Sequence, residues 1–221
     1  LSADGNATGL VTGYYEPLLR GSRTQTDAFA QPVRGVPDDL LTIDLSTLFP
    51  ELKDKRVRGR LEGNKVVPYW SRAEIGARGD KVPSRTLLYT DDAVELFFLQ
   101  VQGSGRVKMP DGSMVRLNYG DQNGHPYQSI GKVLIERGEL KLEEASMQGI
   151  QAWARANPAK LNDLLNANPS YVFFREVPNS KDGPQGALGV PLVAERSIAI
   201  DPRSVPLGAP VFLATTRPNS S

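Results

Sequence analysis

Cysteine is absent from the 221 residues, and histidine occurs once, as His125. The first absence excludes thiol catalysis, Cys-ligated zinc and disulfide bonds, and a single imidazole cannot form a multi-His metal site. A Ser-His-Asp arrangement would have to use that one histidine. We therefore expect neither a metal nor a cofactor.

An excess of charge of one sign and long apolar runs are missing as well. The 26 Lys and Arg residues nearly balance the 25 Asp and Glu residues, and the net charge of +1 predicts no nucleic-acid partner. No apolar run approaches the ~20 residues that a membrane-spanning helix needs. The chain is 39% hydrophobic and 23% charged, which is ordinary for a globular protein of one large or two small domains.

Glycine and proline, by contrast, are abundant. The 21 Gly and 17 Pro residues are spread in turn-like pairs and predict a mainly β fold of short strands with few helices. Hairpins are expected at 56–69 and 106–117, and a polar crossing segment at 20–42. One further strand is expected to end at Glu16. Others are expected at 86–90, 97–102, 171–174, 187–193, 197–200 and 210–214. The helices are expected at 73–77, after a Ser71/Glu74 capping box, and at 127–137, 143–156 and 158–166.

The remaining side-chain chemistry consists of carboxylates, hydroxyls and amides, which favours acid/base chemistry on a neutral polar substrate such as a sugar polymer. Strand alternation at 13–17 places Tyr14 and Glu16 on one face and Tyr15 on the other. A tyrosine beside a carboxylate can form the floor of a sugar site. A packed ring next to a solvated acid is the alternative.

A second candidate segment is 97–106. If 97–102 is a strand, Gln100 and Gln102 point two amides the same way, toward hydroxyl or N-acetyl groups, and Gly103-Ser104-Gly105 allows a ligand close to the backbone. The segment lacks the Gly-Lys-Ser/Thr ending of a phosphate loop. A plain β-turn with two exposed amides explains the pattern equally well.

A third candidate is Asp201, at the end of the apolar run 197–200 and before Pro202. Apolar neighbours would raise the pKa of such a carboxyl, but the same residue can cap the turn through backbone amides. His125 lies in a turn before a helix, where a loop hydrogen bond is the favoured role. Asp91-Asp92 and Glu143-Glu144 are interpreted as helix starts.

Five motifs spread in order over nearly the whole chain resemble those of the membrane-bound lytic murein transglycosylase A family of Gram-negative bacteria. They are GYYEP (13–17), QVQGSGR (100–106), NGHPYQSIGKVLIERGE (123–139), NPSYVFF (168–174) and SIAIDPRSVPLGAPVFL (197–213). The resemblance implies an enzyme that cuts the β-1,4 bond between N-acetylmuramic acid and N-acetylglucosamine of peptidoglycan and leaves 1,6-anhydromuramoyl ends.

The resemblance also implies an architecture and a location. A double-psi β-barrel domain, formed here by 1–19 and 168–221, is interrupted by a second β-barrel domain at 20–167 that carries a few helices, and the substrate groove lies between them. The expected location is the periplasmic face of the outer membrane, reached through an N-terminal lipid that these residues do not include. Peptidoglycan strands are the expected partner, with other cell-wall enzymes as further candidates.

Catalysis in this family uses one Asp, in an Asp-x-Gly-Gly-Ala-Ile-like segment after the Asp-Pro-x-x-x-Pro-Leu-Gly motif. That motif occupies 201–208, so we expect the catalytic acid beyond Ser221 and a supporting role for Asp201. The residues that fall on the family's substrate-binding segments are Tyr14, Tyr15, Glu16, Gln100, Gln102, Gly103 and Ser104. A noncatalytic module that binds wall glycans and an endoglucanase-like hydrolase remain the alternatives.

Overall fold

The computed structural model describes residues 16–53, 57–179, 183, 188, 190–193, 195–198, 200 and 205–213. It divides into two compact units, Leu1–Asn179 and Ser180–Ser221, and all named helices and strands of the described residues belong to the first. The chain is mainly β with a few helices, as the sequence predicts. No helix in the described part is long and apolar enough to cross a membrane.

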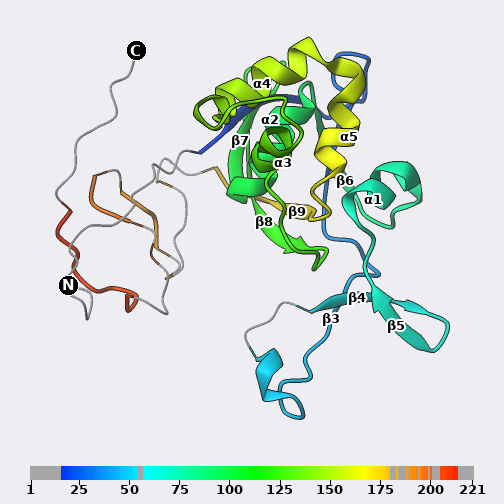
Figure 1. Cartoon of the computed structure of the whole chain (residues 1–221). Helices are drawn as coiled ribbons and strands as arrows, with labels where there is room; N and C mark the ends of the chain where they lie inside the picture. Colours follow the sequence, from blue (N-terminus) through cyan, green and yellow to red (C-terminus); the bar gives the residue numbers. More distant parts are fainter. Residues whose placement is uncertain are drawn as a thin grey trace. The chain divides into compact units, whose positions relative to one another are not determined.

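The strands form two sheets, one of six strands in the order β2-β6-β1-β7-β8-β9 and one of three in the order β3-β4-β5 (Figure 1). β1 runs parallel to β7, and the other neighbours are antiparallel. The strands are β1 (Leu18–Ser22), β2 (Gln31–Arg34), β3 (Leu41–Thr42), β4 (Arg58–Glu62), β5 (Lys65–Pro68), β6 (Thr86–Thr90), β7 (Ser104–Lys108), β8 (Met114–Gln122) and β9 (Val172–Val177).

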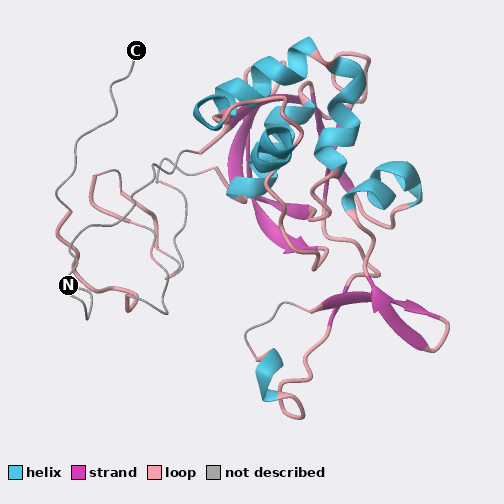
Figure 2. Cartoon of the chain, in the orientation of Figure 1, coloured by secondary structure: helices cyan, strands magenta, loops and turns pink. Residues whose placement is uncertain are grey.

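Most helices gather on one side of β7 and β8, as Figures 1 and 2 show. The α-helices are α1 (Arg72–Arg78), α2 (Ala93–Gln102), α3 (Ile130–Glu136), α4 (Met147–Ala156) and α5 (Leu161–Asn166). The short 3-10 helices are η1 (Pro50–Leu52), η2 (Gly79–Lys81), η3 (Leu142–Glu144) and η4 (Pro158–Lys160).

Several local predictions are confirmed. The hairpin β4–β5 turns at Gly63-Asn64, and β7–β8 folds back around Asp111-Gly112. At the start of α1 the Ser71 hydroxyl accepts from the Glu74 amide while the Glu74 carboxylate accepts from the Ser71 amide, so the capping box is present. These signals are local, and tertiary packing does not override them.

One longer-range prediction is wrong. The interval 20–42 is not a bare crossing segment, because it contains most of β1, all of β2 and β3, and a β2–β6 pairing. The strands expected at 187–193, 197–200 and 210–214 lie partly outside the described residues, and their described part contains no named strand.

The expected second β-barrel is an open, curled sheet in the described residues. Its edge strands β2 and β9 meet at one isolated parallel bridge, Gly35 to Phe174. The curl depends on close backbone approach at Gly120, where a register shift interrupts β8 and a Cβ would lie 2.7 Å from Val36 Cγ2. About half of the residues expected in the double-psi barrel, 1–19 and 168–221, lie outside the described part.

Helix α2 separates two apolar clusters. Val94 and Phe97 pack with side chains of α3, α4 and α5, while Leu96 and Leu99 pack with buried side chains of the six-stranded sheet. α2 is therefore covered on both sides, and it determines where the chain turns into β7.

Gly105 in β7 is a test of this packing. A Cβ there would lie 2.3 Å from Leu99 Cδ1 of α2 and 2.9 Å from the Pro17 carbonyl oxygen. We expect Gly105→Ala to destabilise the fold by about 1–3 kcal/mol, because the backbone or Leu99 must shift. Urea unfolding measures this. The control is Gly76→Ala in α1, where a Cβ meets nothing within 4 Å. The stability of this variant should be unchanged or rise by ~0.5–1 kcal/mol. Equal effects of the two variants would contradict the packing argument.

Candidate functional site

Glu16 joins two arginines just before β1. Its carboxylate lies 3.1 Å from Arg106 Nε and 3.2 Å from Arg116 Nε, and the side chains of Glu16 and Arg116 are only 14% and 10% exposed. The two arginines face each other in the β7–β8 register. Like charges directly opposite are destabilising, so the carboxylate compensates a repulsion that the hairpin itself creates.

The turn that follows α2 lies beside Glu16. Gly103 ends the helix in the left-handed conformation, φ +79°, and its amide donates to the Leu99 carbonyl at 2.8 Å. Ser104 then begins β7, and the Arg106 amide donates to the Pro17 carbonyl at 2.8 Å. Two segments that the sequence singled out, around Glu16 and around Gly103-Ser104, are therefore neighbours. Hereafter we call Glu16, Gly103, Ser104, Arg106 and Arg116 the Glu16 cluster.

The expectation that Gln100 and Gln102 share a strand face is wrong, because 97–102 is the second half of α2. Asp92 caps this helix by accepting from the amides of Val94 and Glu95, and Gly103 ends it. Two residues along an α-helix are about 200° apart, so the two amides point to different sides. Aromatic and β-branched residues suggested a strand, but the caps at both ends and packing on two faces favour the helix.

The two glutamines consequently have different surroundings. Gln100 is 5% exposed, and its Nε2 donates to the Val172 carbonyl at 3.3 Å. It lines a pocket between β2, α1, α2 and α5. Gln102 is half-buried at the end of α2, next to Gly103. The structure places Gln102 with the Glu16 cluster and Gln100 elsewhere.

Tyr14, Tyr15 and Asp201 lie outside the described residues. His125 has the predicted loop role, since its ring Nε2 lies 2.7 Å from the Tyr69 carbonyl oxygen. Within the described ranges, no group of three or more His, Asp or Glu side chains is gathered to hold a metal ion.

One donor of the Glu16 cluster is unpaired. Arg116 Nη2 is buried without a hydrogen-bond acceptor in the described part of the chain. Burial and the nearby Asp92 raise the pKa of Glu95. That residue is in the first turn of α2, however, about 12 Å along the helix from Gly103. Glu95 therefore lies apart from the Glu16 cluster.

Sequence reasoning missed Arg116 altogether. The turn signal at Asp111-Gly112 does not supply this pairing, because a two-residue turn there would place Arg106 opposite Leu117. The loop has five residues between Lys108 and Met114, and this register pairs Arg106 with Arg116. Two arginines facing each other on a half-buried sheet require an acid, and Glu16 is that acid. The carboxylate itself was predicted, but its partners were not.

Removal of the Glu16 charge tests the cluster. We expect Glu16→Gln to destabilise the fold by about 3 kcal/mol, because two facing guanidinium groups lose their carboxylate. Chemical unfolding provides the measurement, and the double variant Glu16→Gln/Arg116→Gln should recover part of the loss. The matched control is Glu136→Gln, which removes the exposed i,i+4 pair with Lys132 and should cost about 0.5 kcal/mol or less. A Glu16→Gln effect no larger than the control effect would contradict this role.

Comparisons with known proteins agree over most of the chain. Residues 10–175 match the family described as MltA specific insert domain. Membrane-bound lytic murein transglycosylase A of Escherichia coli K12 is 38% identical over 210 residues, which cover 93% of this chain and 49% of the relative. The Vibrio cholerae protein of the same name is 32% identical, with 92% of this chain and 48% of the relative covered. The chain spans about half the length of the curated relatives it matches.

Solved structures show the same likeness. MltA from Neisseria gonorrhoeae is 41% identical with a TM-score of 0.80, covering 90% of this chain and 56% of that one. E. coli MltA with bound chitohexaose is 36% identical with a TM-score of 0.67, covering 88% and 50%. The family match extends over well more than half of the residues, and the identities exceed 30%. The chain therefore belongs to the MltA family.

Proposed function

We propose that the protein is a lytic transglycosylase, which cleaves the β-1,4 bond between N-acetylmuramic acid and N-acetylglucosamine in peptidoglycan and leaves 1,6-anhydro ends. The observation that carries the proposal is the match to membrane-bound lytic murein transglycosylase A over 93% of this chain. The relative with bound chitohexaose, an oligomer of β-1,4-linked N-acetylglucosamine, supports a glycan as the ligand.

The chemistry requires one acid. A hydrolase needs an acid plus a nucleophile or base, whereas in this reaction the C6 hydroxyl of the muramic acid attacks its own C1. One carboxyl group protonates the leaving oxygen and then accepts the proton of that hydroxyl. We place this acid beyond Ser221 and give Asp201 the role of setting its hydrogen bonding.

The described residues supply binding and positioning in this proposal. Glu16 and Arg106 connect the start of β1 to the start of β7. We assign Tyr14 and Tyr15, which precede Glu16 in the sequence, to substrate binding as well. Gln102, Gly103 and Ser104 provide amide, backbone and hydroxyl groups suited to sugar oxygens and N-acetyl groups. Gln100 contributes indirectly, through the buried side of α2.

The proposed architecture keeps the division inferred from the motifs. Residues 1–19 and 168–221 contribute to a double-psi barrel, 20–167 form the inserted domain, and the glycan lies in a groove between them. β1 crosses the first of these boundaries, and the first compact unit extends past the second, to Asn179. The relatives' names include "membrane-bound", which supports our proposed location at the periplasmic face of the outer membrane.

Product chemistry tests the reaction. We expect the complete protein to release fragments of purified peptidoglycan that end in 1,6-anhydromuramic acid, because the attacking hydroxyl is internal to the sugar. Mass spectrometry distinguishes these ends from reducing ends, which are one water heavier. Reducing ends would contradict the proposal in favour of an endoglucanase-like hydrolase. Binding without any cleavage would indicate a noncatalytic wall-glycan module.

Asp201→Asn in the complete protein tests the supporting role. We expect a lower kcat and a displaced pH-rate profile, because a neighbour of the acid influences when that acid is protonated. The control is Asp27→Asn, an exposed loop carboxylate, which should leave both unchanged. An unchanged pH-rate profile in Asp201→Asn would contradict the supporting role and leave turn capping as the role of this carboxylate.

A further inference from the structure

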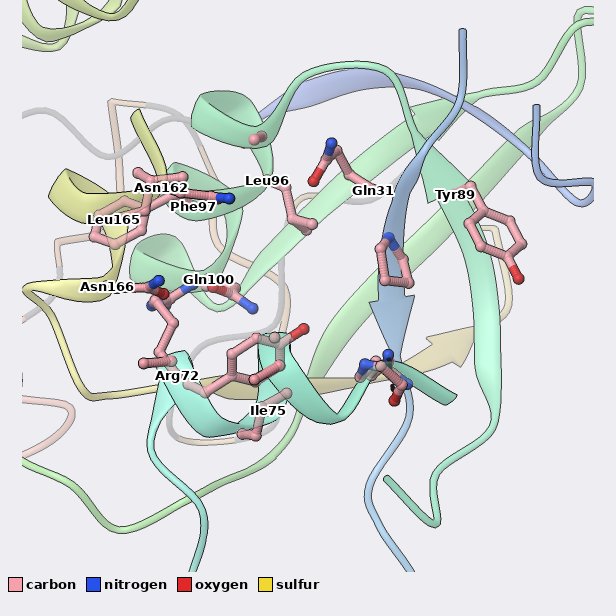
Figure 3. A pocket seen from close by; sticks show the side chains of 18 of the residues that line it. Gln31, Arg72, Ile75, Tyr89, Leu96, Phe97, Gln100, Asn162, Leu165 and Asn166 are labelled. Atoms are coloured by element: carbon pink, nitrogen blue, oxygen red, sulfur yellow. Dashed lines mark hydrogen bonds between the residues drawn. The ribbon is translucent and has the colours of Figure 1, made fainter. Parts of the chain in front are cut away.

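A pocket of about 660 Å³ lies within the first compact unit, away from the Glu16 cluster. Its walls come from β2, α1, α2, α5 and the residue before β9, and Figure 3 shows Arg72, Gln100 and Asn166 on one side with Gln31 and Tyr89 on the other. The volume is in the usual range for sites that bind small organic ligands.

Arg34 places one buried positive charge in the pocket wall. The residue is 4% exposed, and its Nη2 donates to the Gly79 carbonyl at 2.9 Å. The guanidinium also lies at the hydroxyl of Tyr171. No carboxylate in the described part of the chain forms an ion pair with it. Arginines are rarely so buried unless an acid pairs with them.

Arg72 adds a second positive charge, which is half-buried. Its guanidinium lies 4.7 Å from the Phe97 ring and 5.1 Å from the Tyr171 ring, and it donates to the carbonyls of Asn168 and Ser170 at 3.1 and 2.7 Å. Burial lowers the pKa of this arginine to about 10, so it is still charged at neutral pH. Its partners are carbonyls and rings, which orient the charge without neutralising it.

Gln100 contributes a hydrogen-bond acceptor, in contrast to the two arginine donors. Its Nε2 is used by the Val172 carbonyl, but its Oε1 is buried without a donor among the described residues. A buried acceptor without a donor is unfavourable, because it has lost its hydrogen bonds to water. Among the described residues, the two arginines therefore lack an anion and Gln100 Oε1 lacks a hydrogen-bond donor.

The rim of the pocket is polar and adds little compensating charge. Asn162 and Asn166 of α5 and Gln25 are exposed there. Asp80 is the one carboxylate among the described lining residues; it is exposed and forms no ion pair with either arginine. Two positive charges thus face the pocket against one solvated acid.

We propose that this pocket binds the free carboxylate end of a short peptide. The carboxylate lies against Arg34 and Arg72, and the adjacent amide N–H donates to Gln100 Oε1. Arginine recognises carboxylates with charge-assisted hydrogen bonds, which are the strong ones. The source of the peptide rests on the proposed function: peptidoglycan carries short peptide stems that end in carboxylates, and the pocket would hold a stem while the glycan occupies the groove.

The test titrates the full chain with N-acetyl-D-alanyl-D-alanine by calorimetry, and with the same dipeptide as its carboxamide. We expect a Kd on the order of 1 mM or tighter for the acid and at least tenfold weaker binding of the carboxamide. Inorganic phosphate serves as a plain anion and should bind more weakly than the acid. No binding of the acid, equal binding of the carboxamide, or tighter binding of phosphate would each overturn the proposal.

Variants locate the site. Arg34→Gln should weaken binding of the acid at least tenfold, whereas Arg155→Gln, which removes an exposed arginine from α4, should leave it unchanged. Equal effects would overturn the assignment to this pocket. If Arg34→Gln does not fold, as judged by circular dichroism, Gln100→Leu replaces it and should weaken binding of the acid, because the ligand amide N–H loses its acceptor; unchanged binding would overturn the assignment to this pocket.

The outcome is separable from that of the proposed function. Anhydro products from the complete protein together with no binding of the acid would overturn the pocket assignment alone. Binding of the acid by a protein that releases no anhydro ends would support the pocket's chemistry and overturn peptidoglycan as the source of the peptide.

Discussion

The two-sided packing of α2 is the constraint on which the rest of the structure depends. Leu96 and Leu99 pack with the sheet while Val94 and Phe97 pack with the other helices, so the helix can neither rotate nor slide without opening one of two cores. Its C-terminal end then delivers Gly103 to the start of β7. The position of this one helix affects both the Glu16 cluster and the pocket. Its C-terminal end positions the cluster, and side chains on one of its faces line the pocket.

Arginine is used in two contrasting ways around that helix. Arg116 is neutralised by Glu16, which makes the β7–β8 hairpin compatible with two facing cations. Arg34 is buried and Arg72 is half-buried, but their partners are carbonyl oxygens and aromatic rings. A buried charge that lacks a counter-ion reduces stability unless something in the surroundings compensates it. In the first arrangement a carboxylate of the chain compensates the positive charge, while the second favours an external anion.

Sequence reasoning was most successful where the signal was local or extended over long motifs. The capping box at Ser71, the turn at Gly63-Asn64 and family membership all follow from residues close together in the chain. It failed at 97–102, where aromatic and β-branched residues indicated a strand. The helix forms there because Asp92 and Gly103 cap both ends, and because burial on two sides favours a shape that can present side chains in all directions.

The sequence by itself determined the family, the hairpins with their turns and the absence of thiol chemistry, because each depends on residue type and short spacing. Only the tertiary structure decided which charges meet. Glu16 is 100 residues from Arg116, and Arg34 is 66 residues from Gln100, although the latter two line one pocket. Such pairs are set by sheet order and helix packing, which arise from many weak apolar contacts distributed over the chain. No spacing in the sequence encodes them directly.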